Sequence, residues 1–325
     1  MQKIDLHQDL ISSFSRDLSL FQKKVEWKPV GNTNAGGLPN YKEADLQIVW
    51  AWVWPYQIIS DPNNPQKRLV QFSNKKLISD WKQYELLRKE NAIALILDGK
   101  ELAETKYVDF QLNFVYHLKW MDGLAGVEDV KKLQNAWFRS MQLVWEFDNH
   151  LAHCHRSAEG GLTELGLDIL QYMDQNKIII DTANMNYPSM IETYQFTKKP
   201  IMNSHANVMG LYKHSRNVTD DFLDLINKSE WIIGLSLSSS FIRWDTVATI
   251  DDYIEQIKYV RARVWDSYIA LGSGYHSVYF NQLVSGLENI SDMTLLEERI
   301  VKEFGYKFAG MFFWENAYRF LVQTV

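Results

Sequence analysis

The chain has 325 residues, and its formal net charge of −6 with a pI near 5.8 argues against nucleic acid as a partner. Hydrophobic residues make up 46% of it, enough for a large core, and the single cysteine, Cys154, excludes an internal disulfide and indicates a reducing compartment. We see neither a signal peptide nor an apolar stretch of about 18 residues, so we expect a cytoplasmic protein without a membrane partner.

Short apolar runs alternate with longer helical patterns along the chain. This alternation is typical of a parallel sheet whose strands are joined by crossover helices. Strands are predicted at residues 4–9, 46–53, 113–119, 141–145, 177–181, 200–204, 231–237 and 268–272. This number of strands predicts an α/β fold, a single (β/α)8 TIM-like barrel that occupies residues 1–325 as one domain.

Helical patterns lie between the later strands. They cover residues 127–139, 162–176, 187–197, 219–228 and 249–264. Three of them begin with residues that favour a helix start. Pro188 suits a first turn, while Asp220 with Asp221, and Asp251 with Asp252, complement the positive end of a helix dipole.

The segment from about 54 to 112 is longer and more polar than the other connections. We interpret it as an elaborated crossover between the second and third barrel strands. Within it, a helix is predicted around residues 76–91 and a short strand around residues 92–97.

A His-Gln-Asp sequence at residues 7–9 ends the first predicted strand. Residues two apart on a strand point to the same face, so His7 and Asp9 can direct an imidazole and a carboxylate at one metal ion. In barrels of this type, active sites form at the C-terminal ends of the strands. The first strand therefore ends in a candidate metal site.

Several segments, in chain order, resemble the membrane (renal) dipeptidases, a family of amidohydrolase-like zinc metallohydrolases. The segments are HQD at 7–9, Asn149, GLTELG at 161–166, IDTAN at 180–184, PIMNSHA at 200–206, HSRNVTDD at 214–221 and ENAYRFL at 315–321. The resemblance covers most of the chain. It implies a metallo-dependent-hydrolase barrel that holds two zinc ions, bridged by a glutamate, and hydrolyses dipeptides.

The resemblance also assigns six metal-ligand positions, of which this chain keeps half. The retained ligands are His7, Asp9 and His205. The replaced ligands are the bridging glutamate, now Lys119, the histidine after the fifth strand, now Asn184, and the aspartate after the eighth strand, now Gly274.

The exchange at Lys119 has the largest electrostatic consequence, because a carboxylate shared by two dications becomes an ammonium. Two unit charges about 4 Å apart, at an effective dielectric near 20, interact by about 4 kcal/mol, so an ammonium beside a dication costs on the order of 8 kcal/mol. We therefore expect Lys119 to pair with Asp9 in place of a dinuclear zinc centre. A single weakly bound zinc, or a carbamate on Lys119 that restores a bridging carboxylate, are the alternatives.

Two further positions concern the ligand. Arg216 matches the arginine with which the family binds the substrate's terminal carboxylate, and a guanidinium does so with two parallel hydrogen bonds. A salt bridge to Asp220 or Asp221 is its structural alternative. Trp145 matches a substrate-binding position, where it would wall an apolar pocket or pack in the core.

Two functions are therefore expected, and neither assigns a catalytic residue. The first is a dipeptidase-family barrel with an eroded metal site that binds a small carboxylate-bearing ligand, such as a dipeptide, with little or no hydrolysis. The alternative is an active metal-dependent dipeptidase or related amidohydrolase with a mononuclear or lysine-carbamate-bridged site. The expected partner is a small molecule or dipeptide, and a homodimer is left open.

Overall fold

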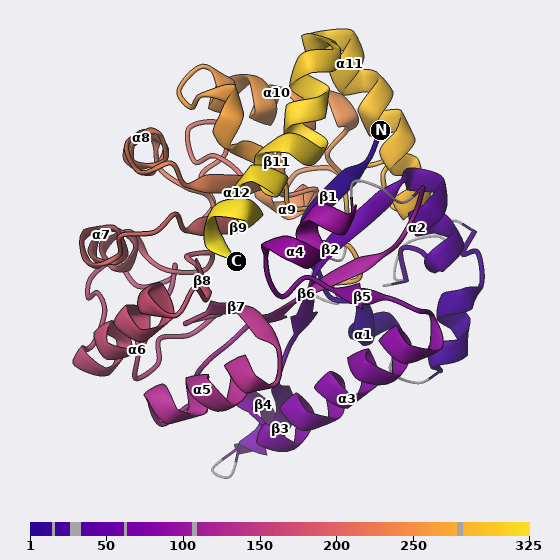
Figure 1. The fold of residues 1–325 in the computed structure, drawn as a ribbon. Helices are drawn as coiled ribbons and strands as arrows, with labels where there is room; N and C mark the ends of the chain where they lie inside the picture. The colour runs from indigo at the N-terminus through magenta and orange to yellow at the C-terminus, as the bar shows by residue number, and fades with distance from the viewer. Residues whose placement is uncertain (15–16, 27–33, 62–63, 106–108, 278–281) are drawn as a thin grey trace.

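Parallel strands follow one another around a nearly closed barrel that is surrounded by helices (Figure 1). The computed structural model describes residues 1–14, 17–26, 34–61, 64–105, 109–277 and 282–325. The barrel strands, in their order around the sheet, are β1 (Lys3–Gln8), β2 (Leu46–Val53), β6 (Asn113–Leu118), β7 (Phe138–Gln142), β8 (Ile179–Asp181), β9 (Met202–Ala206), β10 (Ile232–Leu235) and β11 (Ile269–Leu271). The predicted fold is confirmed, and each of its eight strands is present, although the range of the fourth is shifted.

Helices and turns cover the outside of this sheet. The helices are α1 (Leu10–Phe14), α2 (Leu38–Ala44), α3 (Asn74–Glu90), α4 (Gly99–Glu104), α5 (Val127–Asn135), α6 (Glu164–Gln175), α7 (Tyr187–Phe196), α8 (Asp220–Ser229), α9 (Ser239–Ile242), α10 (Ile250–Arg261), α11 (Met293–Gly310) and α12 (Asn316–Thr324). Shorter turns are η1 (Leu18–Gln22), η3 (Asp266–Tyr268), η4 (Ile290–Asp292) and the π-helical η5 (Met311–Glu315). The predicted helix starts are confirmed at α7, α8 and α10.

Alternate residues of β2 belong to two different cores. Ile48, Trp50 and Trp52 pack in the barrel interior together with apolar residues of the other strands. Val49, Ala51 and Val53 pack instead in the outer core, with the helices. A strand that is buried on both faces needs this nearly continuous apolar sequence. The interior residues of the other strands are Ile4, Leu6, Val115, Ile179, Met202, Ile232 and Ala270, and α12 adds Ala317, Phe320 and Leu321.

Two glycines allow close backbone approach on the side of the barrel formed by β9, β10 and β11. A Cβ atom at Gly234 or at Gly272 would clash with the backbone carbonyl oxygen of Ser204. Glycine is therefore required where these strands meet, and it lets β9 lie deep in the barrel.

The barrel closes between β1 and β11, directly at the His-Gln-Asp sequence. Gln8 and Tyr275 form a parallel bridge. The backbone N–H of Gly274 donates to the carbonyl of His7 at 3.1 Å, and that of Asp9 donates to the carbonyl of Tyr275 at 3.2 Å. The ends of the first and last strands therefore hold each other in place.

The predicted boundaries of two neighbouring elements were wrong. The helix predicted at 127–139 ends at Asn135, and the strand predicted at 141–145 occupies Phe138–Gln142. Trp137 has a φ of 72°, in the left-handed region, which ends the helix and lets the strand begin earlier.

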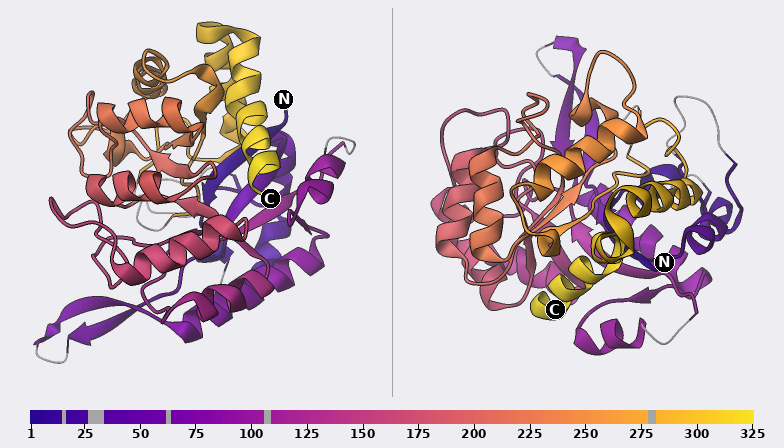
Figure 2. Two further views of the ribbon diagram at one scale, coloured as in Figure 1. Left: turned by 60° about the vertical axis from the view of Figure 1, so that its left-hand side comes forward. Right: turned by 90° about the horizontal axis from the view of Figure 1, so that it is seen from above.

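The crossover between β2 and β6 contains a hairpin that was not predicted. Strands β3 (Tyr56–Asp61) and β4 (Asn64–Phe72) pair antiparallel and project from the barrel (Figure 2). The predicted helix is confirmed as α3, and the predicted short strand as β5 (Ala94–Leu95), which pairs with β6. Residues 62–63 and 106–108 of this crossover lie outside the described residues. In the part of the chain that the structure describes, no helix has the length and apolar character needed to cross a membrane.

Candidate functional site at the barrel mouth

Two histidines from opposite parts of the sequence meet at the C-terminal ends of the strands. The rings of His7 and His205 stack with their centroids 3.9 Å apart and an angle of 8° between their planes. The ring of Trp52 meets His7 edge-on at 4.1 Å. The expected convergence of these two ligand positions is therefore confirmed.

Lys119 and Asp9 form a buried ion pair beside these histidines. The distance from Lys119 Nζ to Asp9 Oδ2 is 2.9 Å, as the charge exchange predicted. The ammonium also lies 4.1 Å from the ring centroid of Trp54 and 5.3 Å from that of Trp52, so aromatic faces complete its surroundings. His7 Nε2 lies 3.8 Å from the same carboxylate oxygen.

Burial and these cations determine the protonation of the site. Burial, followed by the charge of Lys119, holds the pKa of His7 well below its usual value. Burial, followed by the charges of His7 and Arg216, does the same to the pKa of His205. Burial also lowers the pKa of Lys119, but the charge of Asp9 opposes that effect. Both histidines are therefore neutral at physiological pH, and the positive charge of the site resides on lysine and arginine.

A chain of hydrogen bonds links Arg216 to the barrel interior. Arg216 Nη2 donates to His205 Nε2 at 2.9 Å, and Ser204 Oγ donates to Asp181 Oδ2 at 2.6 Å. Because the Ser204 hydroxyl donates its hydrogen bond to Asp181, its oxygen accepts from His205 Nδ1–H at 2.8 Å, which fixes the tautomer of the imidazole. Burial, opposed by the hydrogen bond from Ser204, raises the pKa of Asp181 to about 6.

His117 is a further buried histidine that sequence reasoning missed. Its ring stacks on Trp52 at 3.8 Å, its Nδ1 lies 2.8 Å from Ser140 Oγ, and its Nε2 lies 3.7 Å from Asp181 Oδ2. It stands two residues before Lys119 on β6, so the period of a strand places it on the same inner face. The two-residue spacing between His117 and Lys119 is the sequence pattern that could have identified it.

Arg216 forms no salt bridge with Asp220 or Asp221 in the described structure. Asp220 instead accepts from Tyr259 at 2.9 Å and lies 3.5 Å from Arg263. Arg216 is only 5% exposed, donates from Nη2 to His205, and lies 5.4 Å from the ring centroid of Phe241. Among the described residues, no carboxylate lies within 4.0 Å of its guanidinium. Burial lowers its pKa to about 10, so it remains charged at neutral pH.

Glu146, which sequence reasoning did not single out, supplies a negative charge at the same mouth. Its Oε1 lies 3.5 Å from His155 Nε2, and its other oxygen pairs with Arg156. Burial acts to raise the pKa of Glu146, but His155, Arg216 and Arg156 outweigh burial and hold it at about 2. His155 is itself held by Ser215, whose Oγ lies 2.9 Å from His155 Nδ1.

Trp145 packs in a buried cluster of tryptophans. Its ring centroid lies 4.8 Å from that of Trp54 and 5.9 Å from that of Trp120. Tyr56, Val70 and Phe72 of the hairpin pack against the same cluster. This arrangement matches the packing alternative, and it places the hairpin against the wall of the mouth.

The two remaining replaced positions have left-handed backbone conformations. Asn184 has a φ of 70° and Gly274 a φ of 83°. The side-chain oxygen and nitrogen of Asn184 are buried, and neither has a hydrogen-bond partner in the described structure. Across the described ranges, no three His, Cys, Asp or Glu side chains form a group that could hold a metal ion.

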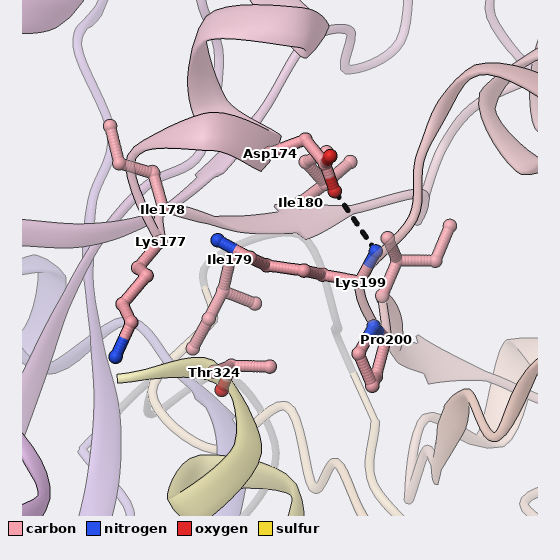
Figure 3. A pocket seen from close by; sticks show the side chains of 9 residues that line it. Asp174, Lys177, Ile178, Ile179, Ile180, Lys199, Pro200 and Thr324 are labelled. Carbon is pink, nitrogen blue, oxygen red and sulfur yellow. Dashed lines mark hydrogen bonds between the residues drawn. The ribbon is translucent and has the colours of Figure 1, made fainter.

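A separate pocket lies at the other ends of β8 and β9 (Figure 3). It is lined by Asp174, Lys177, Ile178, Ile179, Ile180, Lys199, Pro200, Ile201 and Thr324. Its volume of about 10 Å³ has room for about one water molecule. It is therefore too small for a ligand.

Comparisons with known proteins agree with this geometry. A model of the membrane dipeptidase family (peptidase family M19) matches residues 1–325. A dipeptidase of Aspergillus oryzae is 28% identical over 134 residues, which are 41% of this chain and 31% of that protein. An uncharacterized dipeptidase of Schizosaccharomyces pombe is 27% identical over 191 residues, 56% of this chain and 46% of that protein. The chain thus spans less than half of either dipeptidase.

Solved structures resemble the whole chain. A metallopeptidase from Rhodobacter sphaeroides, liganded with a phosphinate mimic of the dipeptide L-Ala-D-Ala, matches with a TM-score of 0.84 and 16% identity over 100% of this chain and 99% of that one. The probable dipeptidase PvdM from Pseudomonas aeruginosa matches with a TM-score of 0.84 and 13% identity over 100% and 95%. At these identities the structures show a shared fold.

Proposed function

Because this chain belongs to the membrane dipeptidase family, we propose that it binds a small carboxylate-bearing ligand, such as a dipeptide, with little or no hydrolysis. The observation that carries this proposal is the state of Arg216. Its guanidinium is buried at the barrel mouth and charged, yet no carboxylate of the described chain lies within 4.0 Å of it.

A buried cation without a direct anionic partner is costly, because the protein replaces only part of its hydration. A guanidinium has five N–H donors, and in the described structure the hydrogen bonds of the Arg216 guanidinium come from Nη2, to the ring and carbonyl of His205. A ligand carboxylate would use the remaining donors with two parallel hydrogen bonds. The free energy of binding would then come from completing a charge pair that the chain leaves incomplete.

The donor set at the mouth argues against a dinuclear zinc centre. The bridging position carries the ammonium of Lys119, which already pairs with Asp9 at 2.9 Å. Asn184 supplies an amide and Gly274 no side chain, so His7, Asp9 and His205 are left to serve two ions that need at least three or four donors each. The proposed binding therefore requires no zinc.

Calorimetry with L-alanyl-L-alanine tests the proposal directly. We expect the wild type to bind this dipeptide, and Arg216→Ala to weaken binding by at least about tenfold, the equivalent of a charge-assisted pair, while circular dichroism shows a folded barrel. Hydrolysis of the dipeptide should stay at background with added zinc or manganese. Metal-dependent turnover that disappears in His205→Ala would overturn the proposal and favour the mononuclear or carbamate-bridged dipeptidase.

Restoring the family's ligands tests the explanation for the missing centre. We expect the triple variant Lys119→Glu, Asn184→His, Gly274→Asp to bind zinc measured by elemental analysis, because it supplies the bridge and two further donors. The matched control replaces Lys119 by Gln in the same triple background and should bind far less. Equal zinc in the wild type and in the restored variant would show that the exchanged residues do not decide metal binding.

A further inference from the structure

We propose that the ligand is a zwitterion whose ammonium group binds to Glu146 while its carboxylate binds to Arg216. This inference rests on the proposed function and extends it, because it assigns the second charged contact of the ligand. It makes Glu146 a specificity-determining residue of the site.

The two residues lie in nearby loops at the C-terminal ends of the strands. Glu146 lies in the loop that follows β7, and Arg216 lies in the loop that follows β9, on either side of β8 (Figure 1). His155 connects the two loops, because it contacts Glu146 with Nε2 and Ser215, the neighbour of Arg216, with Nδ1. The side chain of His155 therefore ties the loop of Glu146 to the loop of Arg216.

The opposite charges do not touch. No ion pair within 4.0 Å joins Arg216 to Glu146 in the described structure. They nevertheless lie within electrostatic range, since Glu146 is the negative charge with the largest effect on the pKa of Arg216, and Arg216 helps to lower the pKa of Glu146. Two nearby opposite charges that are not joined to each other are complementary to a molecule that carries the opposite pair, an ammonium and a carboxylate a few bonds apart.

Glu146 has capacity for this additional contact. An ionised carboxylate offers about four lone-pair directions, and the contacts of Glu146 to His155 and Arg156 use one on each oxygen. Its side chain is 22% exposed, so a ligand in the mouth can reach it. The neighbouring carboxylate, Asp9, already holds Lys119 at 2.9 Å and is almost fully buried. Of these two carboxylates, Glu146 is the one available to a ligand.

This arrangement also predicts which molecules are rejected. A ligand with a carboxylate but without an ammonium brings a second negative charge next to Glu146, and a ligand with only an ammonium is repelled by Arg216. Free amino acids and unblocked dipeptides satisfy both charges. N-acylated peptides and peptide amides satisfy one charge each.

The test compares three probes by calorimetry at neutral pH: L-alanyl-L-alanine, N-acetyl-L-alanyl-L-alanine and L-alanyl-L-alaninamide. In the wild type we expect the unblocked dipeptide to bind about tenfold more tightly than the acetylated one. In Glu146→Gln, of nearly the same shape, this difference should disappear, and in Glu146→Asp part of it should remain. Glu128→Gln, which changes a carboxylate that is 78% exposed and pairs with Lys131, is the control and should keep the full difference.

Each outcome has one meaning. If the wild type binds the acetylated and the unblocked dipeptide equally, the zwitterion assignment is wrong and carboxylate binding by Arg216 still stands. If Glu146→Gln weakens all three probes alike, Glu146 acts only on the structure of the mouth, which also overturns the assignment. If no probe binds, the proposed function itself fails.

Discussion

At the barrel mouth Lys119 and Asp9 are in contact at 2.9 Å, whereas Arg216 and Glu146 are not in contact. The first pair is closed, because each charge is compensated by the other. We call the second pair open, because no direct ion pair joins the two charges although each affects the pKa of the other. Both contain a buried cation, so the difference between them lies in what the chain leaves for a ligand to complete.

The two pairs should differ in how much each contributes to folding stability. Removing one member of a closed buried pair leaves an uncompensated charge inside the protein, which is strongly destabilising. Removing a member of an open pair relieves a burial cost that the fold was already carrying. Substituting a residue that serves binding should therefore lower the free energy of unfolding less than substituting a residue of a structural ion pair.

Breaking the closed pair should have the largest effect. We expect Lys119→Met to lower the free energy of unfolding by about 3–5 kcal/mol, because it leaves the Asp9 carboxylate buried and unpaired. Urea denaturation measures this change. The same substitution at Lys131, whose ion pair with Glu128 is exposed, is the control and should cost less than about 1 kcal/mol. Equal losses in the two variants would contradict the closed pair.

The next effect concerns pH and Asp181, whose charge also acts on Arg216. Its pKa is about 6 in the folded protein, above the value of 3.8 expected for the unfolded chain. Between these values the unfolded state loses its proton first, so stability falls as pH rises through this window and is constant above it. About two units at roughly 1.4 kcal/mol each make this loss up to about 3 kcal/mol.

Asp181→Asn should remove this dependence. We expect the variant, relative to the wild type, to gain up to about 3 kcal/mol between pH 4 and pH 6.5 in urea denaturation. Comparing the two pH values for one variant cancels the constant effect of the altered hydrogen bonds. A difference that does not change with pH would mean that the pKa of Asp181 is not raised by burial.

Breaking the open pair should have the smallest effect on folding. In the absence of ligand, we expect Arg216→Met to change the free energy of unfolding by no more than about 1 kcal/mol. The lost hydrogen bond to His205 costs about that much, and the relief of the buried guanidinium offsets part of it. A loss as large as that of Lys119→Met would make Arg216 a structural residue and remove the basis of the comparison.

Much of the closed pair could be predicted from the sequence, because it depends on strand ends and charge alone. His7 and Asp9 follow from the period of a strand and from the rule that barrel sites form at strand C-termini. Lys119 was identified by the resemblance, and its pairing with Asp9 by its charge. The open pair could be predicted only in part. Arg216 was identified by resemblance, but it is left unpaired by Asp220 because Asp220 contacts Tyr259 of α10 and Arg263, which follows that helix.

Glu146 could not be predicted because its role depends on loops. Its contact to His155 and the contact of His155 to Ser215 join segments whose conformations are not periodic. The hairpin of β3 and β4 did have a signal, the Pro-Asn-Asn-Pro sequence at 62–65 between two β-like runs. The early start of β7 had none, because a tryptophan rarely adopts the left-handed conformation of Trp137.

The closure of the barrel has a consequence for the order in which the protein is made. Strand β1 completes its hydrogen bonds only with Tyr275 and Gly274, and its apolar residues Ile4 and Leu6 are covered in part by α12. A ribosome releases the N-terminal end first, so this strand emerges long before the segments that enclose it. Contacts across some 266 residues also make closure a slow search. The nascent chain therefore carries an uncovered strand edge until residues 274 and 275 have been made.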